Sequence, residues 1–455
     1  GATVSGNSVS ARSSSAGSAA VEGGGVLGAA SSDGAAISHS VIRRNTASGA
    51  NDGTGNAGAA GAGIAAVTSP VVSTLVTGNA VRVTASGTNP DQPVQANGLG
   101  SGLSVAKNYD PGSTASVISD STFTRNSVTS SYTGSGSGLA QVAGAAIGAA
   151  TGIADSTVNG NTAHATGSGT GAAVTSAPAL SGAALARTML SSTKVAGSRL
   201  AAPSARTARR TVVPALTTNL RSEVRAVVTQ VRRASARHAA TSARHAAGGP
   251  DDASLAIDSA LITGGGIGGL TGPAVNTTIS GNAAASTSTG TGLASATGGG
   301  IDAAAALVSD TIAGNAATAR GPAGSAASGG GVGTSASLAN TIVAGNSPAD
   351  CAAPTGADLG GNLDSDGSCG LSAANGSVSA GQARLGGLRD NGGPTRTRAL
   401  LTGSQAIGIG LVATCEQDTG PSGVADTDQR GAARNSAARG VCDSGAYDTG
   451  GQPAG

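Results

Sequence analysis

Apolar residues recur along this chain in one four-residue phrase: an apolar residue, any residue, Gly or Arg, and then Asn. The phrase occurs eight times, and its first residue is always Val, Ile or Phe. The eight Asn residues are Asn7, Asn45, Asn79, Asn126, Asn161, Asn282, Asn315 and Asn346. They lie 31 to 47 residues apart, except for one interval of 121 residues. Self-similarity at this period predicts a solenoid, in which each unit buries its apolar side against its neighbours.

A second phrase, rich in Gly and ending in an apolar residue, usually stands upstream of the Asn phrase, as in 23–26, 61–64 and 264–267. The apolar residues are mostly Val and Ile among Ser and Thr, which favours strands over helices. Gly clusters would cost about 1 kcal/mol per residue inside a helix but suit sharp corners. We therefore expect an all-β fold, a parallel β-helix whose successive coils pair about 4.8 Å apart.

The recurrent Asn suits a tight corner, because Asn tolerates the left-handed backbone region and hydrogen-bonds to nearby backbone. On stacked coils the Asn amides could bond to each other along the axis, as they do in cross-β ladders. The apolar residue three positions earlier would then point inward and form one buried column. A ligand-binding role for the Asn column is the alternative.

Composition leaves two interpretations. The 76 Gly, the single Phe, the lack of Trp and the 11% of charged residues exclude a core of large side chains, so the chain is either disordered or a solenoid of small residues. Disorder predicts no positional regularity and usually a high net charge. Here the apolar position is kept in all eight phrases and the formal net charge is only +2, which favours the solenoid.

The pattern divides the chain into four parts. We expect coils over residues 1–200, a basic insertion at 201–249, coils again over 250–348, and a loop-rich C-terminal region at 349–455. Within the long interval, 171–174 and 188–190 are compatible with one further coil.

The insertion is part of a strongly basic stretch. Residues 187–244 hold 12 Lys and Arg against one Glu, and the apolar spacing from Leu220 to Val231 predicts an amphipathic helix. A solvated Arg-rich face and contact with an anionic surface are both compatible with this pattern. Specific nucleic-acid binding is not expected, because the segment has no aromatic residue and no recognition motif.

All four cysteines follow the last Asn phrase, and their spacing fits neither a CxxC metal site nor a redox motif. Four cysteines allow three pairings. We expect the pairs that are near in sequence, Cys351 with Cys369 and Cys415 with Cys442. Disulfides indicate an oxidising compartment and would stabilise the last coil, which has no following neighbour.

Nothing at the N-terminus has the charged and apolar segments of a signal peptide, and no apolar run is long enough to predict a membrane span. We expect a secreted or cell-surface protein, whose signal peptide would be cleaved or lie outside this sequence.

Several C-terminal motifs point to a known family. They are Asn-Leu-Asp-Ser-Asp-Gly-Ser-Cys at 362–369, Asp-Asn-Gly-Gly-Pro-Thr-Arg-Thr at 390–397, Ala-Leu-Leu at 399–401, Asp-Gln-Arg-Gly at 428–431 and Cys-Asp-Ser-Gly-Ala-Tyr at 442–447. They resemble the C-terminal region of bacterial choice-of-anchor Q surface proteins. The upstream phrases resemble the repeats of polymorphic outer membrane proteins. The resemblance implies a right-handed parallel β-helix on or outside a bacterial cell, mostly without assigned catalytic activity. No anchoring tail is visible before Gly455, so the mode of retention stays open.

Parallel β-helices also house polysaccharide lyases and hydrolases, which need paired or clustered carboxylates. The position six residues before the phrase Asn holds His39, Ser73, Asp120, Asp155, Asn276, Ser309 and Asn340. On adjacent coils Asp120 and Asp155 would lie about 5 Å apart and could bind a cation or share a proton. The same residue types would also serve a corner that accepts backbone N–H groups, and we expect that structural role.

Asn362, Asp364, Asp366 and Gly367 match the first half of a calcium loop. The Glu expected six residues after the Gly is replaced by Ala373, so a tight polar turn is favoured over calcium. No cofactor is expected.

Two functions from different classes remain. The first is a non-catalytic, extracellular or cell-surface scaffold of the adhesin type, monomeric, with a cell-surface glycan or anionic wall polymer as partner. The second is a carbohydrate-active β-helix enzyme. A groove that gathers three or more acidic side chains on neighbouring coils would favour the enzyme. With one Phe and three Tyr, an aromatic platform for sugars is not expected.

Overall fold

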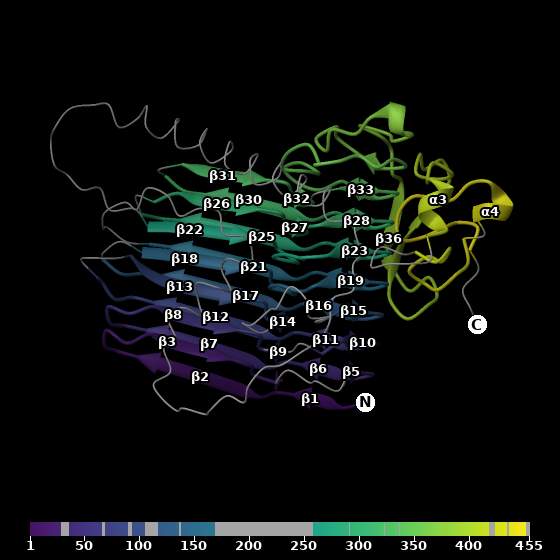
Figure 1. The fold of residues 1–455 in the computed structure, drawn as a ribbon. Helices are drawn as coiled ribbons and strands as arrows, with labels where there is room; N and C mark the ends of the chain where they lie inside the picture. Colours follow the sequence, from purple (N-terminus) through teal and green to yellow (C-terminus); the bar gives the residue numbers. More distant parts are fainter. Residues whose placement is uncertain are drawn as a thin grey trace, which may run out of the picture. The chain divides into compact units, whose positions relative to one another are not determined.

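The computed structural model describes residues 1–28, 36–65, 69–89, 93–104, 117–135, 138–168, 258–290, 292–322, 324–335, 337–417, 424–434 and 436–451. All of them belong to one compact unit. Most of its strands lie in long parallel sheets and very little of it is helix (Figure 1), which agrees with the predicted all-β solenoid. Among the described residues no helix is long and apolar enough to cross a membrane.

The strand before each phrase Asn belongs to a nine-stranded parallel sheet, called sheet I here. Its strands are, in order, β1 (Thr3–Ser5), β6 (Val41–Arg43), β11 (Leu75–Thr77), β16 (Thr122–Thr124), β20 (Thr157–Asn159), β24 (Thr278–Ser280), β29 (Thr311–Ala313), β34 (Ile342–Ala344) and β35 (Leu363–Asp364). The register aligns the apolar phrase residues of all eight coils, from Val4 to Val343. The predicted apolar column is therefore present, and only Val4, on the first coil, is partly exposed.

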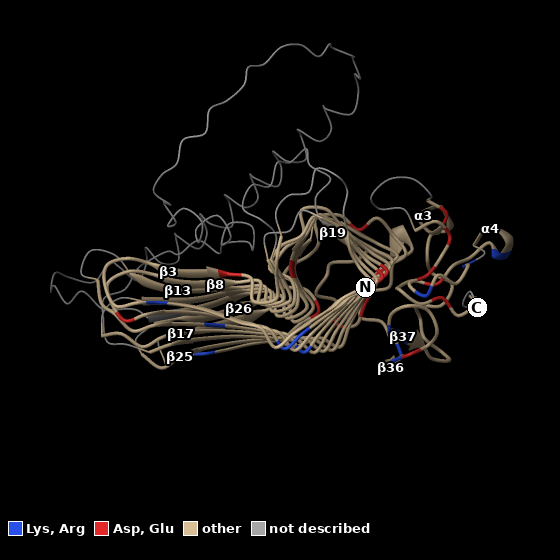
Figure 2. Cartoon of the chain, turned by 90° about the horizontal axis from the view of Figure 1, so that it is seen from below, with Lys and Arg blue, Asp and Glu red and all other residues tan. Residues whose placement is uncertain are grey.

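Two further sheets of seven strands follow each Asn. Sheet II consists of β2 (Ser8–Ser13), β7 (Thr46–Asn51), β12 (Ala80–Ala85), β17 (Ser127–Tyr132), β21 (Thr162–Gly167), β25 (Ala283–Ser288) and β30 (Ala316–Arg320). Sheet III consists of β3 (Ala19–Glu22), β8 (Ala57–Ala60), β13 (Val94–Leu99), β18 (Gly138–Ala143), β22 (Asp258–Thr263), β26 (Ala294–Thr297) and β31 (Ser325–Ser328). Figure 2 shows the two sheets as facing layers, and their inner side chains form one cluster made mostly of Ala and Val. Small side chains let the layers approach each other closely.

The Gly phrase turns each coil out of sheet III. Its first Gly has a positive φ in every coil, for example +78° at Gly264, and a Cβ on Gly265 would lie only 2.3 Å from the carbonyl oxygen of Gly299 on the next coil. Glycine is therefore required both by the backbone conformation and by the close approach of neighbouring coils.

Short strands follow this corner and lead to a third seven-stranded sheet, sheet IV. The corner strands are β4 (Val26–Leu27), β9 (Ile64–Ala65), β14 (Leu103–Ser104), β27 (Ile301–Ala304) and β32 (Val332–Ser335). Sheet IV consists of β5 (Ile37–Ser38), β10 (Val71–Val72), β15 (Val117–Ser119), β19 (Gly152–Ala154), β23 (Pro273–Val275), β28 (Ala306–Val308) and β33 (Leu338–Ala339). Ile, Val and Leu residues from sheets I and IV and the corner strands form the second and larger-residue part of the core.

The stack of coils is continuous across the 121-residue interval. Strand β21 pairs directly with β25, and β18 pairs directly with β22. In the sequence, residues 169–257 stand between β21 and β22. The further coil expected at 171–174 and 188–190 lies outside the described residues. The basic insertion at 201–249 and its expected helix lie outside the described residues.

After the last Asn phrase the chain first closes the end of the stack and then runs along its side. The remaining elements are the 3-10 helix η1 (Ala373–Asn375), the antiparallel pair β36 (Leu385–Arg389) and β37 (Thr397–Leu400), and the short helices α3 (Val412–Cys415) and α4 (Ser436–Arg439). The expected end cap thus comprises only about the first thirty residues after Asn346. The later residues, here called the flank region (380–451), hydrogen-bond to the outer side of sheet I.

Candidate functional site

The phrase Asn residues form a continuous hydrogen-bonded ladder inside the stack. In each of the first seven, the backbone N–H and the side-chain Nδ2 both donate to Oδ1 of the next Asn, over 2.9–3.1 Å. The second Nδ2 hydrogen goes to a carbonyl of the preceding coil, as from Asn126 to Val76 over 3.0 Å. An amide has two donors and one acceptor oxygen, so a ladder Asn within the stack has no polar group left for a ligand. The Asn column therefore has the structural role.

Asp350 ends this ladder. Its Oδ1 accepts the backbone N–H and Nδ2 of Asn346, at 3.0 and 2.9 Å, and its Oδ2 accepts both the N–H and the hydroxyl of Ser365, each at 2.7 Å. A carboxylate has only acceptors, so it completes the row without needing another acceptor beyond it. Next to it, Cys351 is bonded to Cys369, and both cysteines lie in the large-residue core. This disulfide closes the end of the stack.

The seven polar residues six positions before the Asn all have left-handed backbone conformations, with φ between 47° and 53°. They form the predicted left-handed corner between sheets IV and I, but of these seven described side chains only that of Asn340 accepts a backbone N–H, from Leu411. Asn and Asp tolerate this conformation better than most residues. The register of β15 and β19 places Asp120 and Asp155 on adjacent coils, with Asn276 next to Asp155 on the following coil.

The two carboxyl groups at this corner influence each other. Burial, and then the charge of Asp120, raise the pKa of Asp155 to about 7, although a hydrogen bond from Asn276 acts in the opposite direction. Burial also raises the pKa of Asp120. A carboxyl group in such an environment can hold its proton near neutral pH. This pair is the strongest candidate for acid–base chemistry in the described part of the chain.

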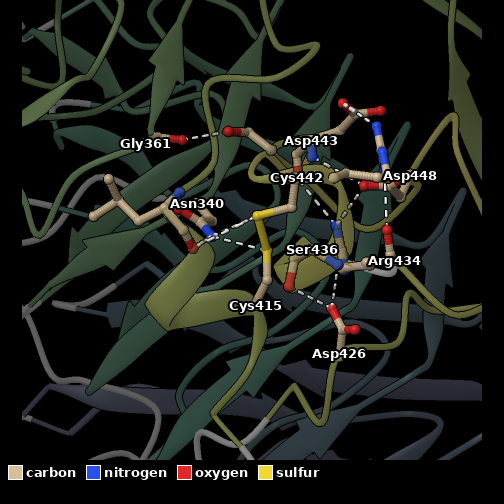
Figure 3. Close-up of a disulfide and its surroundings, with 12 residues drawn as sticks. Asn340, Gly361, Cys415, Asp426, Arg434, Ser436, Cys442, Asp443 and Asp448 are labelled. Carbon is tan, nitrogen blue, oxygen red and sulfur yellow. Dashed lines mark hydrogen bonds and ion pairs between the residues drawn. A yellow bond between two sulfur atoms is a disulfide. The ribbon is translucent and has the colours of Figure 1, made fainter.

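The flank region covers the same corner further along the stack. The Thr395 hydroxyl donates to the backbone carbonyl of Asp155 over 2.9 Å. Asn340 exchanges hydrogen bonds with the backbone of Leu411, at 2.8 and 3.1 Å, and its Nδ2 lies 3.3 Å from Sγ of Cys415. Cys415 is bonded to Cys442, so the second disulfide lies beside the stack rather than at its end (Figure 3). Both disulfides are the pairs that the sequence predicts.

A buried network of charges organises the flank region. The Arg434 side chain is fully buried, and its guanidinium donates to three backbone carbonyls and, over 3.0 Å, to Oδ1 of Asn276. Asp448 lies 3.8 Å from it, and Asp443 and Asp428 are buried nearby (Figure 3 shows the first two). Burial lowers the pKa of Arg434, while these carboxylates raise it again. The motif residues at 428–431 and 442–447 thus serve packing in this structure.

Gln429 joins the two coils that border the long interval. Its Nε2 donates to the hydroxyl of Thr157 over 3.1 Å, and its Oε1 accepts the hydroxyl of Thr278 over 2.6 Å. Thr157 lies before residues 169–257 in the chain and Thr278 lies after them. The flank region therefore holds together coils that the interval separates in sequence.

The calcium candidates lie close together but use their oxygens elsewhere. Asn362 accepts the N–H of Thr341, and Asp364 accepts those of Cys369 and Ala380. Asp366 accepts the N–H groups of Asp350 and Ser368. Among the described residues no three His, Cys, Asp or Glu side chains form a group that could hold a metal. The contacts are those of the tight polar turn.

Sequence reasoning missed a second polar column, five residues before each Asn. It consists of Ser40, Thr74, Ser121, Ser156, Thr277, Asp310, Thr341 and, at the end of the stack, Asn362. Most of these side chains accept the backbone N–H of the preceding coil, as Ser121 does from Thr74 over 3.1 Å. Burial raises the pKa of Asp310 well above its usual value. The regular recurrence of Ser and Thr at this position was the available signal.

The buried Asp302 on β27 was also missed, and burial raises its pKa to about 7. Among the five corner strands Asp302 is the only acidic residue. No paired carboxylates therefore result at that corner.

Comparison of the chain with protein families, with curated proteins and with solved structures finds no match.

Proposed function

We propose that the protein is a non-catalytic extracellular scaffold, built as a right-handed parallel β-helix like that implied by its resemblance to choice-of-anchor Q surface proteins. The main observation in support of this proposal is that several acidic side chains accept hydrogen bonds inside the fold. Asp350, Asp364, Asp428 and Asp443 are all fully buried and accept backbone N–H groups. General acid–base cleavage of a glycosidic bond instead needs two carboxyls directed into one cleft.

The two disulfides support an oxidising, extracellular location. The continuous stack supports a scaffold role, because a solenoid presents long, regular faces that loops can decorate without disturbing the core. Labelling of producing cells with a membrane-impermeant reagent tests the location. Recovery of the protein only after cell lysis would contradict it.

A carbohydrate-active enzyme is the second candidate, and the Asp120–Asp155 pair favours it. Adjacent coils place the residues about 5 Å apart, and a carboxyl that holds its proton near pH 7 beside a second carboxyl is the pattern of a general acid with its partner. The competing structural explanation is the left-handed backbone conformation that all seven residues of the column share.

Turnover assays separate the two candidates. Purified full-length protein is incubated with pectins, alginate, glycosaminoglycans and bacterial wall polymers, and new reducing ends or unsaturated products are measured. We expect no turnover above that of the Asp120→Asn/Asp155→Asn double variant. Asn already stands at this position in two other coils, so the double variant should fold. Turnover that is lost in the double variant would establish the enzyme.

A further inference from the structure

The outer face of sheet II is a flat array of small polar side chains. In its seven strands the inner and outer residues alternate strictly, so three residues of each strand face outward. The outward residues are Ser8, Ser10, Arg12, Thr46, Ser48, Ala50, Ala80, Arg82, Thr84, Ser127, Thr129, Ser131, Thr162, His164, Thr166, Ala283, Ala285, Thr287, Ala316, Thr318 and Arg320. Twelve of these 21 carry a hydroxyl group, and none is acidic, Phe, Tyr, Trp or a large aliphatic residue.

Arginines border this face where sheet I leads into sheet II. Arg44 and Arg125 stand directly before ladder Asn residues, and Arg43 lies beside Arg44; all three are exposed. Arg82 adds a further exposed arginine on the coil between them. In Figure 2 basic positions lie on the layer of β17 and β25 and at its edge. In the described part of the chain, none of these four arginines has an ion-pair partner, whereas Arg12 pairs with Asp52.

The backbone conformation of two of these arginines indicates a role beyond folding. Arg44 and Arg125 have φ values of 55° and 56°. The other six coils have Gly at the same position, again with positive φ. A non-glycine residue is strained in this conformation, and the coil needs no side chain there. Strain of this kind is typical of functional positions.

Arg44 and Arg125 share one register position two coils apart, with Gly78 between them, and Arg82 lies four residues further along the middle coil. Arg43 and Arg44 belong to one coil, Arg82 to the next and Arg125 to the third. Because coils repeat every ~4.8 Å, Arg44 and Arg125 lie ~10 Å apart along the axis, close to the length of two pyranose residues. Guanidinium groups bind carboxylates through two parallel hydrogen bonds, and the neighbouring hydroxyl array offers donors and acceptors for sugar hydroxyls.

We infer that the outer face of sheet II binds a linear anionic polysaccharide along the axis of the stack, through its hydroxyl array and the arginines Arg43, Arg44, Arg82 and Arg125. The inference rests on the proposed scaffold function and names the partner of that scaffold. A polysaccharide fits better than nucleic acid, because the face has no Phe, Tyr or Trp side chain to stack on bases. It fits better than a membrane, because no large apolar side chain on the face can enter a lipid interface.

The test measures binding of full-length protein to polygalacturonate by calorimetry, with neutral dextran as the matched polymer. The key variant is Arg44→Gly/Arg82→Thr/Arg125→Gly, which restores residues found at the same positions of other coils and should keep the thermal transition of the parent. A control variant removes three charges from the basic insertion: Arg221→Gln/Arg225→Gln/Arg232→Gln. We expect the face variant to bind at least tenfold more weakly, the control to bind within twofold of the parent, and binding to weaken with salt.

Several outcomes would overturn the inference. The first two concern the variants: the face variant binds polygalacturonate as tightly as the parent does, or only the insertion variant loses binding. The other two concern the ligand: dextran binds as tightly as polygalacturonate, or single-stranded DNA or anionic lipid vesicles bind more tightly than polygalacturonate. Cleavage of the bound polymer would contradict the non-catalytic scaffold function but not the binding of polysaccharide to this face. A protein that is located at the cell surface and binds no polysaccharide would agree with the scaffold function and contradict the binding face.

Discussion

At the scale of single residues, the most predictable positions were those repeated in every coil. The phrase Asn and its apolar neighbour recur eight times, and one physical explanation accounts for all eight copies. Arg434 shows the limit of this reasoning. It occurs once, its partner Asn276 lies 158 residues away, and an Arg in a polar segment is usually solvated, so nothing in the sequence indicates its burial.

Removal of one ladder amide should destabilise the protein. Asn126→Ala leaves the N–H and Nδ2 groups of Asn79 without their acceptor, and both are buried. Unsatisfied buried polar groups cost about 1–3 kcal/mol each, so we expect a loss of about 2–4 kcal/mol in the free energy of unfolding, measured with denaturant. Asn159→Ala, outside the ladder, is the control. Equal small losses for both variants would contradict the ladder's energetic role.

The Asp155 carboxyl should make stability depend on pH. Its pKa is about 7 in the folded protein against 3.8 as the ordinary value, so between these values the folded state binds more protons than the unfolded chain. Stability therefore falls as pH rises from about 4 to about 7. The full pKa shift would correspond to a change of ~4 kcal/mol in the free energy of unfolding. Because the side chain is partly exposed, we expect a change of about 2 kcal/mol.

Asp155→Asn tests this dependence through thermal unfolding at pH 5 and pH 8. The variant should be more stable than the parent at pH 8 and differ less from it at pH 5. Asp120→Asn should also raise stability at pH 8, because it removes the charge that opposes ionisation of Asp155. A parent and variant that lose stability in parallel from pH 5 to pH 8 would show that Asp155 is not the group responsible.

At the scale of elements, the repeated phrases predicted which segments form strands, while the pairing across the long interval was not predictable. Register in a parallel stack follows from matching side chains, and the cost of closing a loop rises only slowly with its length. Residues 169–257 can therefore be added to one coil without shifting β25 from β21. The further coil that 171–174 and 188–190 suggested lies outside the described residues.

The apolar column of sheet I should depend strongly on its one aromatic residue. Phe123 is fully buried between Val76 and Val158 of the neighbouring coils. We expect Phe123→Ala to lower the free energy of unfolding by about 3–5 kcal/mol, because the coils on both sides cannot collapse fully into the cavity. Val117→Ala, at a strand position that is 46% exposed, should change it by less than about 0.5 kcal/mol. A loss below about 1 kcal/mol for Phe123→Ala would contradict tight stacking.

At the scale of the whole molecule, the position of the C-terminal region was the largest difference from expectation. Its cysteines indicated disulfides, and a solenoid needs a cap, so an end cap was the simplest interpretation. The residues that receive the flank region, such as Thr157, Thr278 and Thr311, face outward from sheet I. Outward Thr residues are equally common on solvated strands, so the sequence does not distinguish a covered sheet from an open one.

Because the flank region joins coils on both sides of residues 169–257, its loss should loosen those coils first. Gln429→Ala removes the buried hydrogen bonds to Thr157 and Thr278 and leaves their hydroxyl groups without this partner, so we expect a loss of about 2–4 kcal/mol. The rate of amide hydrogen exchange should increase more in β20 and β24 than in β6 and β11, which lie far from this contact. The control Gln417→Ala, at an exposed position, should change neither the free energy of unfolding nor the exchange rates. Uniform acceleration of exchange over all coils would mean that the stack unfolds as one unit, and that the flank region covers the coils without holding those two together.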